Sequence, residues 1–187
     1  MNKHILKSAI ILCLTVPWLL LINFFWRKTS RREYIKNLRF NREAFLPLIQ
    51  DSAEIAKADM YVFNIWATWC RPCVEEIPDL NNLKSRYSAP NVAFVALTYE
   101  DSTRTSLFFK KNPNRFTYWQ RNKAFMAIDA LEGLNPDSSL KFSEGGTIPV
   151  HIITYRDRVV YYNIGADEGN IHRMDSVLKR YTGLVKH

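Results

Sequence analysis

One short stretch constrains the fold of this chain more than any other: an apolar run that ends just before a closely spaced cysteine pair. The run, Met60 to Ala67, is rich in aromatic and β-branched residues, which is typical of a buried strand. Cys70 and Cys73 follow, and the pattern from Pro72 to Tyr87 predicts a helix that bends near Pro78. This order of strand, cysteine pair and helix indicates an α/β fold with Cys70 at a helix N-terminus.

That placement predicts redox chemistry at Cys70. Free amide groups and the positive end of the helix dipole stabilise a thiolate at a helix N-terminus, and Arg71 adds positive charge nearby. Cys73 lies one turn deeper and is close enough to form a disulfide with Cys70. We therefore expect Cys70 to attack a substrate disulfide and Cys73 to resolve the mixed disulfide, which leaves the cysteine pair oxidised.

Other uses of a Cys-x-x-Cys pair fit this sequence less well. A zinc site needs four ligands, but the chain has three cysteines, and Cys13 lies inside an apolar run. The later histidines, His151, His172 and His187, have no ligand spacing. A purely structural disulfide is an alternative, although a bridge across a helix start would be strained and hence reducible. We expect neither a metal nor a cofactor.

The remaining patterns alternate between helices and strands, which predicts a mixed sheet covered on both faces by helices. The last two predicted strands follow one another closely and form a hairpin. The expected elements are a helix over Glu43–Lys57, strands over Asn91–Thr98 and Arg115–Trp119, helices over Ser102–Lys111 and Asn122–Leu131, a loop over Asn135–Gly146, strands over Thr147–Thr154 and Arg158–Ile164, and a closing helix over Gly169–Tyr181.

The composition is that of a folded domain and argues against nucleic acid as a partner. An apolar fraction of 47% is enough for a packed core, and 187 residues suit one domain with an appendage. The net charge is +8, but the basic excess is concentrated between Arg27 and Arg39, and the rest of the chain is close to balanced. A surface that binds nucleic acid would extend this excess over the folded domain.

The N-terminus predicts attachment to a membrane. Ser8 to Trp26 contains no charged residue and approaches the roughly 20 apolar residues that a membrane-spanning helix needs. A cleaved signal peptide is the alternative, but the exit from Asn23 to Trp26 lacks the small residues that precede a cleavage site. We expect an uncleaved anchor over residues 1–26, a basic linker over residues 27–42 and the folded domain over residues 43–187.

Two observations conflict over which side of the membrane the domain occupies. More basic residues follow the predicted span than precede it, and the positive-inside rule would then keep the domain in the cytoplasm. Disulfide chemistry favours the periplasm or the cell exterior, where disulfides persist. We expect the domain on that outer side, and the charge count leaves the orientation open.

The segment from Val62 to Cys73, with its hexapeptide Trp-Ala-Thr-Trp-Cys-Arg, resembles the active-site strand and helix of the thioredoxin superfamily. It is most similar to the membrane-tethered TlpA/ResA-type disulfide reductases, and the resemblance extends over residues 43–182. It implies a thioredoxin-like fold, protein thiol and disulfide substrates and an upstream electron donor. Cys70 then matches the nucleophile, Cys73 the resolving cysteine and Pro78 the helix-kinking proline.

The resemblance also implies roles for residues around the cysteine pair. Thr147-Ile148-Pro149 matches the loop whose cis-proline packs against the cysteines, and Ile148 would offer its backbone to substrate. Glu76 matches a glutamate near the cysteines, where it could relay the proton of Cys73; the alternative is an ordinary acid in the first helical turn. The residues expected to contact substrate are Trp69, Arg71, Pro72 and Ile148.

Two further residues and two segments qualify this interpretation. Asn64 occupies the place where cytoplasmic thioredoxins carry a buried aspartate, and this is similar to the TlpA type. His151 is expected to be a core residue of a strand rather than a catalytic group. The family has a hairpin before its first buried strand, where Glu43 to Lys57 predicts a helix, and Glu132 to Gly146 is longer than usual.

Two other functions of the same fold are alternatives. One is the binding or delivery of copper by the two thiolates, although copper carriers of this fold usually place three residues between the cysteines and add a histidine. The other is a peroxidase, which needs a threonine before the reactive cysteine at a spacing that this sequence lacks.

Overall fold

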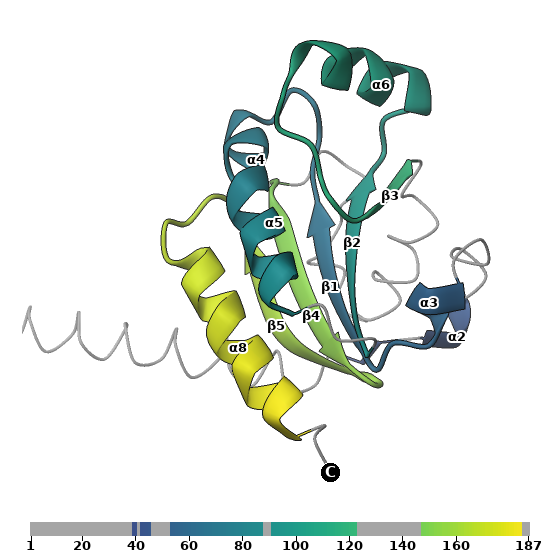
Figure 1. Cartoon of the computed structure of the whole chain (residues 1–187), viewed down its shortest axis with the longest axis vertical. Coiled ribbons are helices and arrows are strands. Elements are labelled where there is room, and N and C mark those ends of the chain that lie inside the picture. The colour runs from purple at the N-terminus through teal and green to yellow at the C-terminus, as the bar shows by residue number, and fades with distance from the viewer. Residues whose placement is uncertain (1–38, 41, 46–52, 88–90, 123–146, 185–187) are drawn as a thin grey trace, which may run out of the picture. The chain divides into compact units, whose positions relative to one another are not determined.

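The computed structural model (Figure 1) describes residues 39–40, 42–45, 53–87, 91–122 and 147–184. None of the helices within these ranges combines the length and apolar character needed to cross a bilayer. The predicted membrane span and most of the basic linker lie outside the described residues, as do most of the helix expected after Asn122 and the loop that follows it.

A five-stranded mixed sheet forms the centre of the fold, in the order β3-β2-β1-β4-β5. β1 pairs in parallel with β2 and antiparallel with β4; β2 and β3 are parallel, and β4 and β5 form an antiparallel hairpin. The central strand β1 is buried along its whole length, as its apolar sequence predicts. The strands are β1 Met60–Ile65, β2 Val92–Thr98, β3 Trp119–Asn122, β4 Val150–Tyr155 and β5 Arg158–Ile164.

The helices pack around this sheet. α5 and α8 lie side by side across one face, and α4 precedes α5 at the end of the sheet where β1 and β2 terminate (Figure 1). The mixed sheet with flanking helices confirms the predicted α/β class. The described helices are α2 Arg42–Phe45, α3 Ala53–Ala56, α4 Arg71–Glu75, α5 Ile77–Arg86, α6 Ser102–Lys111 and α8 Asn170–Leu184.

An aromatic cluster covers one face of β1. Tyr61 and Phe63 point to this face and pack against Phe40 and Phe45, with ring centroids 5.0–5.7 Å apart. The Phe40 amide also donates a hydrogen bond to the Asp157 carbonyl at 2.8 Å. The packed structure therefore includes Phe40, which precedes the boundary expected at residue 43.

A polar network ties α5 to α8 on the opposite face. The Asp175 carboxylate accepts hydrogen bonds from Lys179 at 2.7 Å, from the Tyr87 hydroxyl at 2.8 Å and from Arg86 at 3.3 Å. Burial alone would raise the pKa of Asp175, but these bonds and the two cations outweigh it and lower the pKa. For Tyr87, burial and the bond to Asp175 raise the pKa to about 12.

The expected helix between Pro72 and Tyr87 is interrupted where a bend was predicted. α4 ends at Glu75 and α5 begins at Ile77. Pro78 occupies the first turn of α5, where backbone N–H groups have no partner within the helix, so the missing N–H of proline costs no hydrogen bond. Similarly, β4 begins at Val150 rather than Thr147, directly after Pro149. Proline therefore sets both boundaries through its missing N–H.

Three predicted elements differ from the structure. The strand expected over Arg115–Trp119 begins only at Trp119, because the preceding residues bond to α5: the Asn81 amide donates to the Arg115 carbonyl at 2.7 Å and accepts from the Thr117 amide at 2.9 Å. The helix expected over Glu43–Lys57 is present as two short helices, α2 and α3, with residues 46–52 outside the description. Asn122, expected to begin a helix, ends β3.

Candidate active site

The two cysteines lie at the N-terminus of α4, as predicted, and are joined by a disulfide with their Cα atoms 5.3 Å apart. Cys70 is the N-cap residue, and its Sγ accepts a hydrogen bond from the Cys73 amide at 3.3 Å. Cys70 retains 4% exposure and Cys73 none, so an attacking or departing molecule reaches Cys70 first. Amide donors at the helix start favour negative charge on the Cys70 sulfur when the bond is reduced.

The residues beside Cys70 differ in exposure and charge, and therefore in how they could contact a binding partner. Trp69 is 62% exposed, the largest exposure among the large apolar side chains of the described residues. Arg71 is also exposed and pairs with Glu75 at 2.7 Å, which neutralises part of the positive charge that the sequence placed next to Cys70. Pro72 occupies the first turn of α4, where its missing N–H costs no hydrogen bond.

The Ile148–Pro149 peptide bond is cis, as the resemblance implied. The carbonyl of Pro149 accepts a hydrogen bond from the Gly165 amide at 2.8 Å, which holds the start of β4 against the end of β5. Ile148 is 9% exposed. Because β4 is the antiparallel neighbour of β1, the loop before β4 meets the end of β1 that leads to the cysteines.

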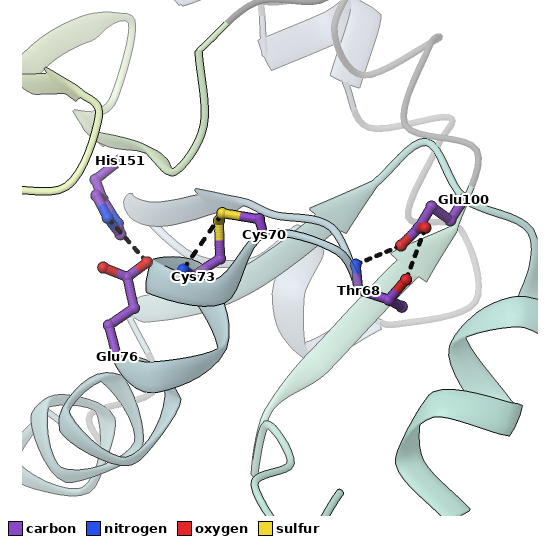
Figure 2. The surroundings of a disulfide bond; sticks show 6 residues. All are labelled: Thr68, Cys70, Cys73, Glu76, Glu100 and His151. Atoms are coloured by element: carbon purple, nitrogen blue, oxygen red, sulfur yellow. Dashed lines mark hydrogen bonds and ion pairs between the residues drawn. A yellow bond between two sulfur atoms is a disulfide. The ribbon is translucent and has the colours of Figure 1, made fainter. Parts of the chain in front are cut away.

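Glu76 and His151 form a pair that the sequence did not predict. Glu76 lies at the break between α4 and α5, and its Oε1 is 3.2 Å from the Nε2 of His151. The His151 side chain is fully buried in β4, and the Glu76 side chain is 16% exposed. Figure 2 shows the two side chains pointing toward one another beside the disulfide. His151 is thus a core residue of a strand, as expected, and also a partner of Glu76.

Further polar groups surround this pair. Asn64 is buried on β1 directly opposite His151 in the β1–β4 register, so both side chains leave the same face of the sheet. Burial raises the pKa of Tyr118, and the charge of Glu76 raises it further, while Asn64 opposes the rise. The Tyr118 hydroxyl therefore stays protonated next to Glu76.

A second buried carboxylate holds the loop that precedes Cys70. Glu100 accepts hydrogen bonds from the Thr68 amide at 2.6 Å and the Thr68 hydroxyl at 2.8 Å, and pairs with Arg104 at 2.9 Å. Its side chain is 6% exposed. Since β1 and β2 are parallel, their carboxyl ends meet at one edge, and this brings Thr68 and Glu100 together (Figure 2).

Glu100 is expected to stabilise this loop measurably. Glu100→Gln replaces one carboxylate oxygen with an amide donor, which then faces a donor of Thr68 or Arg104, and we expect the free energy of unfolding to fall by about 1–3 kcal/mol. Denaturant titration would measure the change. Glu75→Gln is the matched control, because its ion pair with Arg71 is exposed and no measurable loss is expected. Equal stabilities of the two variants would contradict this role.

The structure therefore brings together most of the residues expected at the site, and adds Glu100, Tyr118 and the contact of His151 with Glu76. An acid two residues after an apolar strand was the available signal for Glu100. Among the described residues, no group of three or more histidine, cysteine, aspartate or glutamate side chains could hold a metal ion.

A family model described as Redoxin matches residues 50–178, more than half of the chain. The chain belongs to the redoxin family. It has a thioredoxin-like α/β fold, and its cysteine pair lies at the helix start within the matched region.

Two curated relatives match this redoxin-family chain over a limited region. The thioredoxin-like protein YneN of Bacillus subtilis is 34% identical over 56 residues, which are 30% of this chain and 32% of that protein. The thiol-disulfide oxidoreductase ResA of Bacillus anthracis is 36% identical over 53 residues, which are 28% of this chain and 29% of that protein. The chain thus matches about a third of the length of these relatives.

Two solved structures are similar to this chain at low sequence identity. The bacterioferritin comigratory protein of Xanthomonas campestris has a TM-score of 0.51 at 14% identity, covering 67% of this chain and 80% of that one. StoA of Bacillus subtilis has a TM-score of 0.47 at 15% identity, covering 65% of this chain and 83% of that one. The first of these likenesses shows a shared fold, which is also that of the redoxin family.

Proposed function

We propose that this chain is a thiol–disulfide oxidoreductase that reduces protein disulfides outside the cytoplasm. The observation that carries the proposal is the Cys70–Cys73 disulfide at the N-terminus of α4. Membership of the redoxin family and the relatives named as thiol-disulfide oxidoreductases support it.

The proposed reaction begins with the reduced pair. The Cys70 thiolate attacks a substrate disulfide, so a Cys70–substrate bond forms and one substrate sulfur leaves as a thiolate. Cys73 then loses its proton and attacks Cys70, which forms the Cys70–Cys73 disulfide and releases the second substrate thiolate. Two electrons pass from the cysteine pair to the substrate, and an upstream dithiol donor restores the pair.

Substrate would bind around the exposed edge of Cys70. Trp69 supplies an apolar surface, with Arg71 and Pro72 beside it at the helix start. The backbone of Ile148, before the cis-proline Pro149, is proposed to pair with an extended substrate segment next to the cysteines. This arrangement suits a peptide that carries a disulfide better than a small compact ligand.

Attachment to a membrane belongs to the same proposal. The uncharged segment from Ser8 to Trp26 would anchor the domain, with the cysteine pair on the outer side, where substrate disulfides persist. Protease added to spheroplasts, which lack an outer barrier, should then degrade the domain, and a domain protected in intact spheroplasts and cleaved only after their lysis would place it in the cytoplasm.

Cys73→Ser tests the proposed roles of the two cysteines. This variant keeps the attacking thiolate and lacks the resolving thiol, so it should accumulate mixed disulfides with substrate proteins through Cys70. Non-reducing electrophoresis followed by mass spectrometry of the captured peptides would detect them. Wild-type protein, which resolves such species, should show few under the same conditions.

Cys13→Ser is the matched control, because it makes the same substitution outside the proposed site. It should behave as wild type in capture and in insulin reduction. Two results would overturn the proposal. In the first, the wild-type protein binds copper(I) tightly in a one-to-one ratio and does not reduce disulfides. In the second, it consumes peroxide and does not reduce disulfides.

A further inference from the structure

His151 stands out among the buried polar groups near the cysteines, because the redox steps above do not use it. Its side chain has no exposure, yet its Nε2 faces the Oε1 of Glu76 at 3.2 Å. Within the part of the chain that the structure describes, its Nδ1 makes no hydrogen bond, and the contact of Nε2 with Glu76 is a close approach rather than an aligned hydrogen bond. A buried imidazole of this kind can take up or give back one proton through Glu76.

The resolving step creates a need for such a group. Cys73 has no exposure, so water cannot take its proton directly when the thiol becomes a nucleophile. Glu76 follows Cys73 by three residues, which places both on the same side of the helical turn, and Figure 2 draws the Glu76 side chain next to the turn that carries the disulfide. If the Glu76 carboxylate accepts the proton of Cys73, it can pass that proton on to the neutral imidazole of His151.

The surroundings identify His151 as the basic group that faces Glu76. Tyr118, before β3, remains protonated because burial raises its pKa. Asn64 on β1 and Asn163 on β5 are neutral amides. Asp175 on α8 is already paired with Lys179.

We propose that His151 and Glu76 form a buried proton-holding pair that stores the proton of Cys73 during the disulfide half of the cycle. The proposal deepens the thiol–disulfide function given above and rests on it. In this proposal Glu76 exchanges the proton with the Cys73 thiol. His151 acts on that thiol only through Glu76 and is therefore a positioning residue.

The proton balance follows from the two redox states. With the pair reduced, Cys73 carries its proton, Glu76 is a carboxylate and His151 is neutral. When Cys73 attacks the mixed disulfide, its proton passes to Glu76 and on to the Nε2 of His151, which leaves a carboxylate beside an imidazolium. When a donor dithiol reduces the Cys70–Cys73 bond again, Cys73 leaves as a thiolate and recovers that proton.

The decisive measurement follows Cys73 directly, without a substrate. In a Cys70→Ser background, the rate of alkylation of Cys73 by iodoacetamide is measured against pH, with and without His151→Gln. Glutamine keeps a donor toward Glu76 but cannot accept its proton. We expect the midpoint of the profile to rise by about one pH unit, a tenfold change, because the Cys73 thiolate then forms beside an uncompensated carboxylate.

His172→Gln is the matched control, because His172 is exposed on α8 and the same substitution there should leave the profile unchanged. In a Cys70→Ser, Glu76→Gln background, His151→Gln should have no further effect, since the path between His151 and Cys73 is already broken. Superimposable profiles for His151→Gln and the Cys70→Ser parent would overturn the proposal and identify a purely structural histidine.

A second measurement uses the unaltered protein, in case His151→Gln does not fold. The ring nitrogens of His151, labelled with nitrogen-15, are followed by NMR in the oxidised and reduced forms at one pH. We expect the imidazolium in the disulfide form and the neutral ring in the dithiol form; identical charge states would contradict the pair. Neither readout requires reductase activity, so failure of the insulin assay would count against the proposed function alone.

Discussion

Cys70→Ser is expected to reduce the catalysed reduction of insulin disulfides to the rate of the chemical reductant alone. The serine hydroxyl does not form a thiolate-like nucleophile at neutral pH, so the first covalent bond to substrate cannot form. The substitution is nearly isosteric, and Cys70 is the N-cap of α4, where serine is a favoured residue. The fold should therefore persist while turnover is lost.

The measurement is the turbidity of insulin reduced by dithiothreitol, with far-UV circular dichroism to show that the variant is folded. Cys13→Ser again provides the matched control and should retain wild-type turnover. A folded Cys70→Ser protein that still accelerates insulin reduction would show that the chemistry does not begin at Cys70, and the assignment of the nucleophile would be wrong.

Trp66→Ala is expected to lower the free energy of unfolding by about 3–5 kcal/mol. Trp66 has no exposure and directly follows β1, where its ring lies 5.1 Å from that of Phe116 and 5.4 Å from that of Phe109. Truncation removes these contacts and leaves a cavity between the sheet and α6. A loss of this size is a large fraction of the stability of an ordinary domain.

Guanidinium titration followed by circular dichroism would measure this loss. Trp69→Ala is the matched control: it removes the same side chain three positions later, where the ring is 62% exposed, and it should change stability by less than about 0.5 kcal/mol. Trp66→Phe should lie between the two, because an aromatic ring remains. Equal losses at positions 66 and 69 would contradict the packing described here.

The predictions for Cys70→Ser and Trp66→Ala distinguish a residue needed for chemistry from a residue needed for packing, and the two residues lie within one five-residue segment. Cys70→Ser should abolish turnover while the protein remains folded, whereas Trp66→Ala should lower the free energy of unfolding. The loop between them is held by Glu100 through Thr68, and also by the hydrogen bond from the Cys70 amide to the Ala67 carbonyl at 3.1 Å.

Local patterns predicted many of the elements well. The helix over Ser102–Lys111 and the strand over Arg158–Ile164 have the expected bounds, because a capping aspartate starts the first and the turn at Arg156 and Asp157 precedes the second. β3 was misplaced because the side chain of Asn81, far away in sequence, holds Arg115 and Thr117 away from the sheet. No window of neighbouring residues contains that contact.

The same distinction applies to the site. Spacing and the preceding strand identified Cys70 and Cys73, since a thiolate at a helix start depends on residues adjacent in sequence. The contact between Glu76 and His151 depends on β4 pairing next to β1, and the contact between Thr68 and Glu100 depends on β1 and β2 ending at one edge.

The sequence by itself therefore determined the fold class, the reactive pair and the helix break at Pro78, because each follows from local chemistry: thiol spacing, apolar periodicity and a missing amide. Only the tertiary structure decided which buried acids and bases surround that pair. Sheet pairing brings groups that are distant in sequence to within hydrogen-bonding reach, and burial then makes their charges matter.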